Sequence, residues 1–354
     1  VIPLYDALFD SDIRHILARH EQGAAHAADG YARVTGKTGV CIATSGPGAT
    51  NLVTGLANAH LDSVPLVALT GQVPTDMVGN DAFQEVDMVG IVRPITKHRY
   101  LVKNAKDLPR IMKEAFYIAS TGRPGPVLID LPVDVQKAKA EFRWPEKIDI
   151  RSYNPNYQGH MGQIKKAAEL INKSDKPLLY IGGGVISSNA GAQVFELAKK
   201  AHIPVTPTMM AIGAFPTGSG LYLGMLGMHG TYTANMAMQS ADLVIAVGSR
   251  FDDRITGRIA DFSPNSKKIH IDIDPTSISK NVRADIPIVG DAKAVLGELV
   301  KHVKKSAHKK WLDELSGYTK KTPLAYYKKD NALRPQYIIA VSYTHLTLPT
   351  KRIV

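Results

Sequence analysis

Short apolar runs alternate with helix-like stretches along the first 145 residues. An apolar run of roughly four to eight residues between turn residues is typical of a buried strand, and apolar positions every three or four residues are typical of a helix that faces a core. The predicted strands cover 39–45, 64–71 and 123–132. The predicted helices cover 22–35, 48–60 and 107–120. This alternation favours a parallel sheet covered by helices.

A second block with the same alternation follows a break in the pattern. Residues 142–159 are rich in proline, asparagine and aromatic side chains and have no period, and we interpret 146–159 as a linker. The strands predicted after it cover 176–185, 241–253 and 267–275. The helices predicted there cover 188–201, 230–240 and 292–306. We therefore expect an α/β protein with two doubly wound parallel-sheet domains, over 1–145 and 160–310.

Charge and cysteine content narrow the possible partners and compartment. The formal net charge is +11, but much of the excess lies in scattered C-terminal lysines, which indicates a solvated helix surface, so we expect no nucleic-acid partner. No segment approaches roughly 18 uninterrupted apolar residues, so we expect no membrane span. Cys41 is the only cysteine, which rules out an internal disulfide and fits the cytoplasm. Because the sequence begins at Val1 without a methionine, a targeting segment that preceded it would not be visible.

Two stretches of the first block have candidate chemistry. RHEQGAAHAADGYAR, at 19–33, places Glu21 before a run of small residues that leaves room for a packed backbone or a flat ligand. Glu21 is either a site residue or an ordinary carboxylate at a helix N-terminus. The two histidines of this stretch are six residues apart, which does not suit a metal site. TSGPGATN, at 44–51, is either an anion site made of backbone N–H groups or a tight strand-to-helix turn.

The predicted strands of the second block end in polar or glycine-rich motifs: GGG, GSRFDD and DIDP. Ligands of open parallel sheets bind at the carboxyl ends of the strands. Arg250 and Arg254 could hold a phosphate or carboxylate, or could form an Asp–Arg surface network that contributes little stability. Asp272 and Asp274 could accept hydrogen bonds from sugar hydroxyls. Together these ends favour a nucleotide-like ligand.

Longer stretches resemble a known family, the catalytic large subunits of acetolactate synthase, also called acetohydroxyacid synthase. The matching stretches are HEQGAAHAADGYAR, GVCIATSGPGATNLVTGLANAHLDSVPLVALTGQV, DAFQEVDMVGIVRPITKH, GRPGPVLIDLPVDV, LGMLGMHGTYTAN and VGSRFDDRITG. The resemblance runs from Val1 to about Ile339. It implies that 1–145 binds the pyrimidine of thiamine diphosphate and that 160–310 binds FAD.

The resemblance also implies the reaction and its residues. Pyruvate would lose carbon dioxide, and its two-carbon unit would join a second pyruvate or 2-ketobutyrate, the first common step of valine, leucine and isoleucine synthesis. Glu21 would hydrogen-bond a ring nitrogen of the aminopyrimidine, and we expect desolvation against apolar walls to raise its pKa. Phe83 would shape the pocket, Gln84 could hydrogen-bond a reacting oxygen, and Arg254 would meet the acceptor's carboxylate.

The implied flavin site draws on residues from both blocks. FAD would have no net redox role in the main reaction. The residues that match the family's flavin segments are Arg123, Gly183, Gly184, His229, Gly248, Arg250, Asp272 and Asp291. The active site of the family forms between subunits, so we expect a homodimer or tetramer, with a possible small regulatory subunit.

The sequence also departs from the family. A third domain with a Gly-Asp-Gly segment, which holds magnesium and the diphosphate, has no counterpart in this sequence. We interpret 311–339 as the start of a connection to that domain and 340–354 as a foreign-looking tail. We therefore expect the 354-residue chain alone to be an inactive fragment. The alternatives are another thiamine-diphosphate carboligase or decarboxylase, and a non-catalytic nucleotide-binding module.

Overall fold

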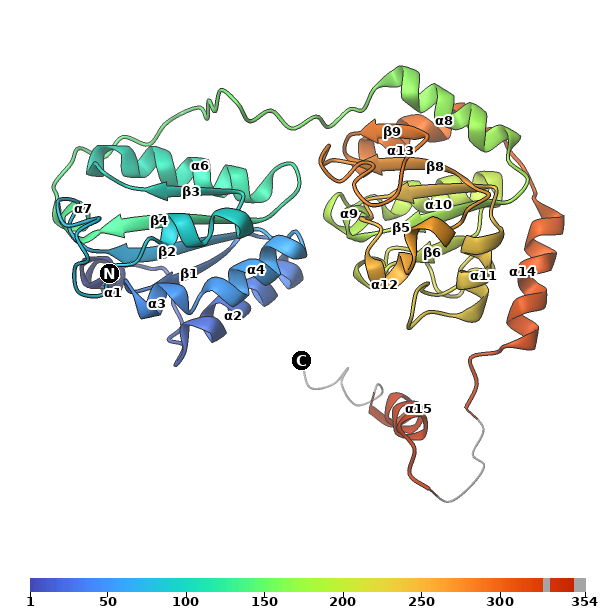
Figure 1. The fold of residues 1–354 in the computed structure, drawn as a ribbon, viewed down its shortest axis with the longest axis horizontal. Coiled ribbons are helices and arrows are strands. Elements are labelled where there is room, and N and C mark those ends of the chain that lie inside the picture. The colour runs from blue at the N-terminus through green and yellow to red at the C-terminus, as the bar shows by residue number, and fades with distance from the viewer. Residues whose placement is uncertain (327–331, 347–354) are drawn as a thin grey trace. The chain divides into compact units, whose positions relative to one another are not determined.

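The computed structural model describes residues 1–326 and 332–346, and these form two compact units, each built on its own parallel sheet (Figure 1). The first unit contains Val1–Gly159 and two short later stretches, Ile273–Pro275 and Val289–Asp291. The second unit contains the other described residues. The predicted fold class, two parallel-sheet α/β domains, is confirmed.

The first sheet has four strands in the order β1-β2-β4-β3, and every neighbouring pair is parallel. Its strands are β1 (Gly39–Ala43), β2 (Leu66–Gln72), β3 (His98–Leu101) and β4 (Pro126–Pro132). Every residue of β2 and β4 is buried, which explains why both strands have nearly continuous apolar sequences. Their register pairs Thr70 with Asp130, close to the carboxyl ends of both strands.

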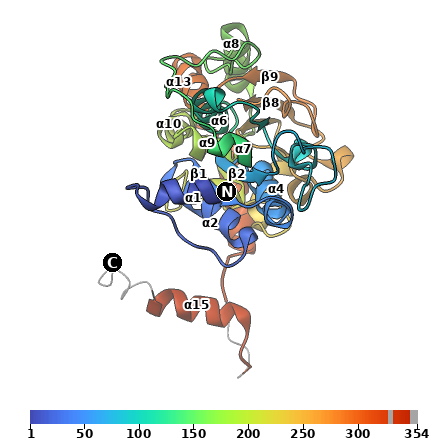
Figure 2. The same cartoon turned by 90° about the vertical axis from the view of Figure 1, so that its left-hand side faces the viewer.

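Helices cover both faces of this sheet. The helices of the first unit are α1 (Ile2–Phe9), α2 (Glu21–Thr35), α3 (Pro47–Thr50), α4 (Val53–Leu61), α5 (Met88–Ile91), α6 (Leu108–Ser120) and α7 (Val133–Lys137). α2 and α4 cover one face of the sheet and α6 covers the other (Figure 1). Apolar side chains of α2 and α4 form one core with β1 and β2, and those of α6 form a second core. α1 packs beside α7 (Figure 2).

Small residues let α2 pack closely on its neighbours. A Cβ added to Gly55 of α4 would lie 2.4 Å from the Cβ of Ala25, and one added to Gly39 of β1 would lie 2.1 Å from the carbonyl oxygen of Ala28. Side chains this close do not occur in close-packed interiors. The buried alanines of α2 therefore serve a packed backbone.

The second sheet has five strands in the order β6-β5-β7-β8-β9. They are β5 (Pro177–Ile181), β6 (Val205–Pro207), β7 (Leu243–Val247), β8 (Lys267–Asp272) and β9 (Ile286–Val289). The parallel register places Tyr180, Ala246 and His270 in one row across β5, β7 and β8. β5 and β7 are buried throughout.

The helices of the second unit also form two layers. They are α8 (Met161–Lys173), α9 (Gly183–Ser187), α10 (Gly191–Ala201), α11 (Tyr232–Ser240), α12 (Asp253–Thr256), α13 (Ala292–His302), α14 (Lys309–Lys321) and α15 (Pro335–Leu346). α8, α10 and α13 bury their apolar faces in one core, and α11 and α14 bury theirs in the other. Trp311 of α14 is buried and donates its indole N–H to the carbonyl oxygen of Pro177 at 3.0 Å.

Several elements differ from the sequence prediction. The helix expected over 48–60 is two helices, α3 and α4, and β3, β6 and β9 lie where no strand was predicted. The strand expected from 123 begins at Pro126, because Gly122 has φ +60° and the segment after it turns before the strand. Of the predicted foreign tail, 340–346 belongs to α15 and 347–354 lies outside the described residues.

Candidate functional site

Glu21 is the first residue of α2 and lies at the carboxyl edge of the first sheet. The side chain of His20 caps the helix, since its Nδ1 accepts a hydrogen bond from the backbone N–H of Gln22 at 3.1 Å. His20 is thus a capping residue. The Glu21 carboxylate accepts a hydrogen bond through Oε2 from Nδ2 of Asn51, also at 3.1 Å.

The glycine turn after β1 brings this carboxylate close to the backbone. A Cβ added to Gly48 would lie 3.2 Å from Oε1 of Glu21, so glycine leaves the space in front of that oxygen open. Gly46 has φ +60°, and a Cβ there would lie 2.7 Å from the carbonyl oxygen of Gln84. The two glycines therefore let Glu21, the turn and the segment around Gln84 meet.

The electrostatics of Glu21 contradict the sequence argument. The hydrogen bond from Asn51 lowers the pKa of Glu21, and this effect outweighs the desolvation that was expected to raise it. Glu21 is only half-buried, so desolvation is weak. The predicted direction of the pKa shift was wrong because the actual direction depends on Asn51, a hydrogen-bond donor 30 residues away in the sequence. Glu21 is ionised at neutral pH.

Phe83 and Gln84 lie on the loop between β2 and α5, and both side chains are exposed, Phe83 to 88%. Gln84 has a left-handed backbone, with φ +57°. Glu85 closes the loop by accepting hydrogen bonds from the backbone N–H groups of Gly79 and Ala82. The loop is therefore ordered while the two predicted site residues face outward.

A buried carboxylate anchors the end of this loop. Asp130 of β4 is 1% exposed and accepts hydrogen bonds from Thr70 Oγ1 at 2.7 Å and from Gln72 Nε2 at 3.0 Å. The same Nε2 also donates to the carbonyl oxygen of Val86 at 2.9 Å. A chain of polar contacts thus runs from β4 through β2 to the loop that carries Phe83. Burial raises the pKa of Asp130 to about 6.

Asp130→Asn is expected to change how stability depends on pH. Because the folded state holds the Asp130 proton more tightly than the unfolded chain does, stability falls as pH rises from about 4 to about 6. The shift of about two pKa units corresponds to roughly 3 kcal/mol, and the amide fits because the Thr70 hydroxyl can accept as well as donate. Denaturant unfolding should show the variant gaining roughly 2 kcal/mol over the wild type between pH 4 and pH 7.5. If the difference in unfolding free energy between the variant and the wild type is the same at both pH values, Asp130 does not titrate in this range.

The predicted flavin glycines of the second unit pack against each other. A Cβ on Gly184 would lie 2.7 Å from the Cα of Gly248, and one on Gly248 would lie 2.5 Å from the Cα of Gly184. Gly182, which is not among the predicted flavin residues, is closer still, because a Cβ added to it would lie 2.1 Å from the carbonyl oxygen of Gly248. These glycines allow the ends of β5 and β7 to meet backbone to backbone, whatever else they do.

Other predicted residues gather at the carboxyl edge of the second sheet. Arg250 follows β7, Asp272 ends β8, and Gly183 begins the helix after β5. The exposed turn that carries His229 is tied to the loop of Arg254, because the backbone N–H of Met228 donates to the Arg254 carbonyl oxygen at 3.1 Å.

Two predicted flavin residues make their contacts in the first unit. Arg123 precedes β4, so it lies at the amino edge of the first sheet, opposite the edge of Glu21. Its guanidinium donates from Nη1 to Asp274 at 3.1 Å and from Nε to the hydroxyl of Ser63 at 2.8 Å. The backbone N–H of Asp291 donates to the carbonyl oxygen of Tyr157 at 2.9 Å.

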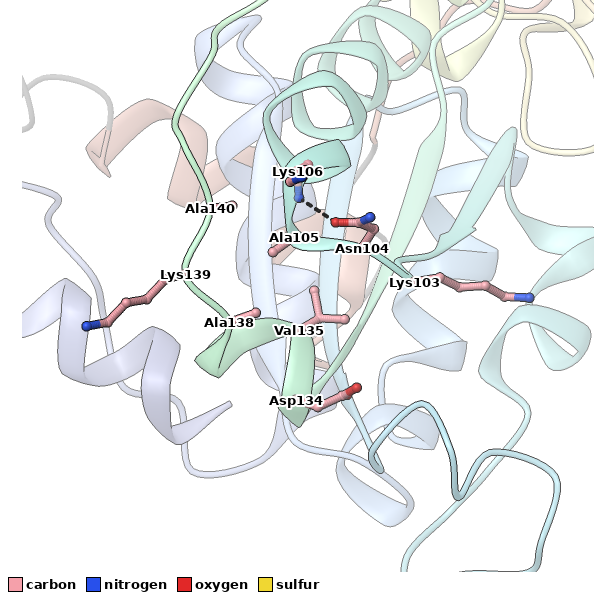
Figure 3. Close-up of a pocket in the computed structure, with 9 residues that line it drawn as sticks. All are labelled: Lys103, Asn104, Ala105, Lys106, Asp134, Val135, Ala138, Lys139 and Ala140. Atoms are coloured by element: carbon pink, nitrogen blue, oxygen red, sulfur yellow. Dashed lines mark hydrogen bonds between the residues drawn. The ribbon is translucent and has the colours of Figure 1, made fainter.

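A hollow of about 180 Å³ lies between the ends of β3 and β4, and none of the predicted site residues lines it (Figure 3). It is lined by Lys103, Asn104, Ala105, Lys106, Asp134, Val135, Ala138, Lys139 and Ala140. The amino groups of Lys103 and Lys139 point away from each other, so they do not converge on one anion (Figure 3). Across residues 1–326 and 332–346, no group of three or more His, Cys, Asp or Glu side chains could hold a metal ion.

Sequence reasoning missed three contributors to these sites: Asn51, the pair Gln72 and Asp130, and His270. Asn51 is the last residue of TSGPGATN, and its position as a polar residue after a glycine turn was the signal that could have identified it. A lone aspartate in the apolar run PVLIDLP was the signal for Asp130. His270, in KKIHID, gave a similar signal within a strand.

Comparison with known families identifies both units. The profile described as "Thiamine pyrophosphate enzyme, N-terminal TPP binding domain" matches residues 1–91. The profile described as "Thiamine pyrophosphate enzyme, central domain" matches residues 164–299.

Within the described residues, no helix is long and apolar enough to cross a membrane.

Individual relatives agree with these profiles. The chain is 54% identical over 346 residues to the acetolactate synthase large subunit of Buchnera aphidicola subsp. Schizaphis graminum, covering 96% of this chain and 61% of the relative. It is 57% identical over 303 residues to the probable acetolactate synthase large subunit of Methanocaldococcus jannaschii, covering 85% and 51%. It is 49% identical over 349 residues to the acetolactate synthase isozyme 3 large subunit of Escherichia coli K12, covering 96% and 61%. The chain thus spans about half to three fifths of the length of these relatives.

Proposed function

Because the chain belongs to the thiamine pyrophosphate enzyme family, we propose that it works as an acetolactate synthase large subunit. The proposed reaction removes carbon dioxide from pyruvate and joins the remaining two-carbon unit to pyruvate or 2-ketobutyrate. The products are acetolactate and acetohydroxybutyrate, and the compartment is the cytoplasm. Thiamine diphosphate, the same compound as thiamine pyrophosphate, supplies the carbanion chemistry when it is bound.

The carboxylate at the start of α2 is the observation that carries this proposal. Asn51 holds Oε2 of Glu21, while Oε1 lies in front of Gly48, where a Cβ would be only 3.2 Å away. The residues present therefore fit an aminopyrimidine, which offers a ring nitrogen to a carboxylate and needs flat space beside it. Glu21 is the group that would hold a proton shared with that nitrogen.

The state of Glu21 suits this task. An ionised carboxylate is a strong hydrogen-bond acceptor, and the Asn51 amide lowers its pKa so that it stays ionised at neutral pH. Because the ring nitrogen carries no proton of its own, Glu21 would take up one proton as the cofactor binds and hold it between its carboxylate and that nitrogen. The backbone of Gln84 meets the same turn, which supports the proposal that Phe83 and Gln84 contact the substrate.

FAD is the second proposed cofactor. Arg250 offers a guanidinium for a phosphate, Asp272 offers a carboxylate for ribose hydroxyls, and Gly183 leaves a helix start without a side chain. The other proposed flavin residues are Gly184, His229, Gly248, Arg123 and Asp291. Arg254, beside the His229 turn, is the proposed contact for the acceptor's carboxylate. Magnesium is proposed as well, but the described residues contain no cluster that fits it, and no step is assigned to it.

The exposed face of α2 supports the proposed homo-oligomer. Gly23, Ala27, Gly30 and Val34 follow helical spacing and are all exposed, Val34 to 88%. Small residues on one stripe allow another helix to approach closely. A second copy of the chain is therefore the proposed partner here, together with a small regulatory subunit.

Acetolactate formation tests the proposed function. We expect a large subunit of the relatives' full length that carries these residues to convert pyruvate to acetolactate, measured by the colour reaction of acetoin formed from it. 2-Ketobutyrate should compete with pyruvate as the acceptor, and glyoxylate should not. Preference for glyoxylate would favour another carboligase. Flavin binding with no turnover under any substrate would favour a non-catalytic nucleotide-binding module.

A further inference from the structure

An aromatic side chain fills a niche at the carboxyl edge of the second sheet. Tyr180, Ala246 and His270 stand in one row across three strands, and the small Ala246 leaves space between the two rings. The ring of Phe251 occupies that space, with its centroid 5.6 Å from that of Tyr180 and 5.1 Å from that of His270. Phe251 is 2% exposed. The chain therefore turns back into the core immediately after Arg250.

The backbone at this turn has an unusual conformation. Phe251 has φ +52°, a left-handed value that bulky residues rarely adopt. Such a conformation persists only where the surroundings fix it. Asp252 then caps α12 by accepting a hydrogen bond from the backbone N–H of Arg254 at 3.0 Å. The position of Phe251 therefore fixes the backbone from which the side chains of Arg250 and Arg254 extend.

His270 contributes a directed contact to the same turn. Its Nε2 lies 2.9 Å from the carbonyl oxygen of Ser249, and since a carbonyl can only accept, the ring proton is on Nε2. The ring is fully buried, and within the described residues its Nδ1 has no hydrogen-bond partner. From outside, Asn281 donates through Nδ2 to the carbonyl oxygens of Arg250 at 3.2 Å and Phe251 at 3.0 Å. Two side chains thus hold three successive carbonyls.

We propose that His270 is a positioning residue for the loop 249–254, which it holds through the hydrogen bond from its Nε2–H to the carbonyl oxygen of Ser249. Asn281 supports the same loop from the surface. These contacts alone support the positioning of the loop. Its consequence, that His270 sets the affinity for a phosphate-bearing flavin near Arg250, rests on the proposed function.

A ring that merely fills the core would behave differently from a ring that donates a hydrogen bond. His270→Phe keeps an aromatic ring against Phe251 but removes the donor. His270→Gln keeps an N–H at a comparable reach and removes the ring. A positioning role through the hydrogen bond predicts that glutamine rescues the loop and phenylalanine does not.

Amide hydrogen exchange of the full chain, read by mass spectrometry, tests the positioning directly. We expect His270→Phe to raise exchange in the peptide over 249–256 by at least about tenfold, while peptides from β5 and β7 stay unchanged. His270→Gln should remain within about threefold of the wild type. Asn281→Ala, at an exposed position, should loosen the same peptide and serves if His270→Phe does not fold. Phe262→Leu, which alters the same aromatic cluster outside the loop, is the matched control and should leave the peptide protected.

Equal protection in His270→Phe and the wild type, or equal loosening in both His270 variants, would overturn the positioning role. If His270→Phe does not fold, unchanged protection in Asn281→Ala would overturn it. FAD titration by fluorescence separates this outcome from the proposed function. If the wild type binds FAD, His270→Phe should bind it about tenfold more weakly, and unchanged affinity would overturn the flavin consequence. If the wild type does not bind FAD, the flavin assignment fails, and the exchange data still decide the positioning role.

Discussion

Replacing Glu21 with glutamine, in a large subunit of the relatives' full length that carries these residues, is expected to lower acetolactate formation by about 10²- to 10⁴-fold. The amide cannot hold the shared proton that the carboxylate holds. It can still accept the hydrogen bond from Asn51 through its oxygen, so the start of α2 stays intact. The only expected cost to folding is the loss of a negative charge at a helix N-terminus, which contributes about 0.3–1 kcal/mol. Turnover number and melting temperature, measured together, check this expectation.

Gln22→Ala is the matched control for this substitution. Gln22 is the next residue in the same helical turn and is exposed, and its backbone N–H, which the variant keeps, makes the capping hydrogen bond to His20. Its activity should stay within about twofold of the wild type, as for surface substitutions away from a site. Glu21→Gln with more than a tenth of the wild-type turnover would argue against the role given to this carboxylate.

Gly248→Ala is expected to destabilise the second unit by about 3–4 kcal/mol. Two costs add up at this position. The backbone has φ +57°, which costs a residue with a Cβ about 1–2 kcal/mol, and the new Cβ would lie 2.5 Å from the Cα of Gly184. The second contact is backbone against backbone, so no side-chain rotation relieves it, and the ends of β5 and β7 must separate.

Gly257→Ala separates these two costs. Gly257 has a similar φ, +55°, with ψ −128°, but nothing lies within 4 Å of an added Cβ. Its expected loss is the conformational cost alone, about 1–3 kcal/mol, which is smaller than the loss expected at Gly248. Denaturant unfolding followed by the fluorescence of Trp311, which is buried in the second unit, measures both variants. Equal losses in the two variants would show that the close approach of Gly184 and Gly248 has no energetic weight.

This result bears on how the glycine motif is interpreted. Gly183, Gly184 and Gly248 are proposed flavin residues, yet the close contact of β5 and β7 already requires glycine at 182, 184 and 248. A loss of FAD affinity in Gly248→Ala would therefore not by itself identify a flavin contact. Arg250 and Asp272, whose side chains have the relevant chemistry, are better positions for that question.

All the strands predicted from the sequence are central in their sheets, except the edge strand β1. β2 and β4 are buried on both faces, and their apolar runs stand out from their surroundings. β3 reads HRYL and is only half-buried, and β6 has three residues, so neither produces an apolar run. Local pattern could not indicate strands whose existence depends on pairing with a neighbour.

In the candidate site, too, the features set by local sequence could be predicted and those set by contacts between distant segments could not. The position of Glu21 at a helix start followed from the small residues after it, and its importance followed from the family resemblance. Its contact with Asn51 could not be predicted, because it depends on how the turn after β1 packs against α2. The error in the direction of its pKa followed from that missing contact. His270 was missed for a related reason, since its role depends on a loop that returns to the sheet.

Exchange of the C2 proton of thiamine diphosphate bound to the protein tests the central role of Glu21 most directly. Deuterium incorporation at the thiazolium ring, followed by quenched-flow sampling and proton NMR, reports proton removal without requiring substrate or turnover. We expect the protein with Glu21 to exchange this proton at least about 10²-fold faster than Glu21→Gln, when both are saturated with the cofactor. Equal exchange rates in the two proteins would contradict the account and reduce Glu21 to an ordinary carboxylate at the start of a helix.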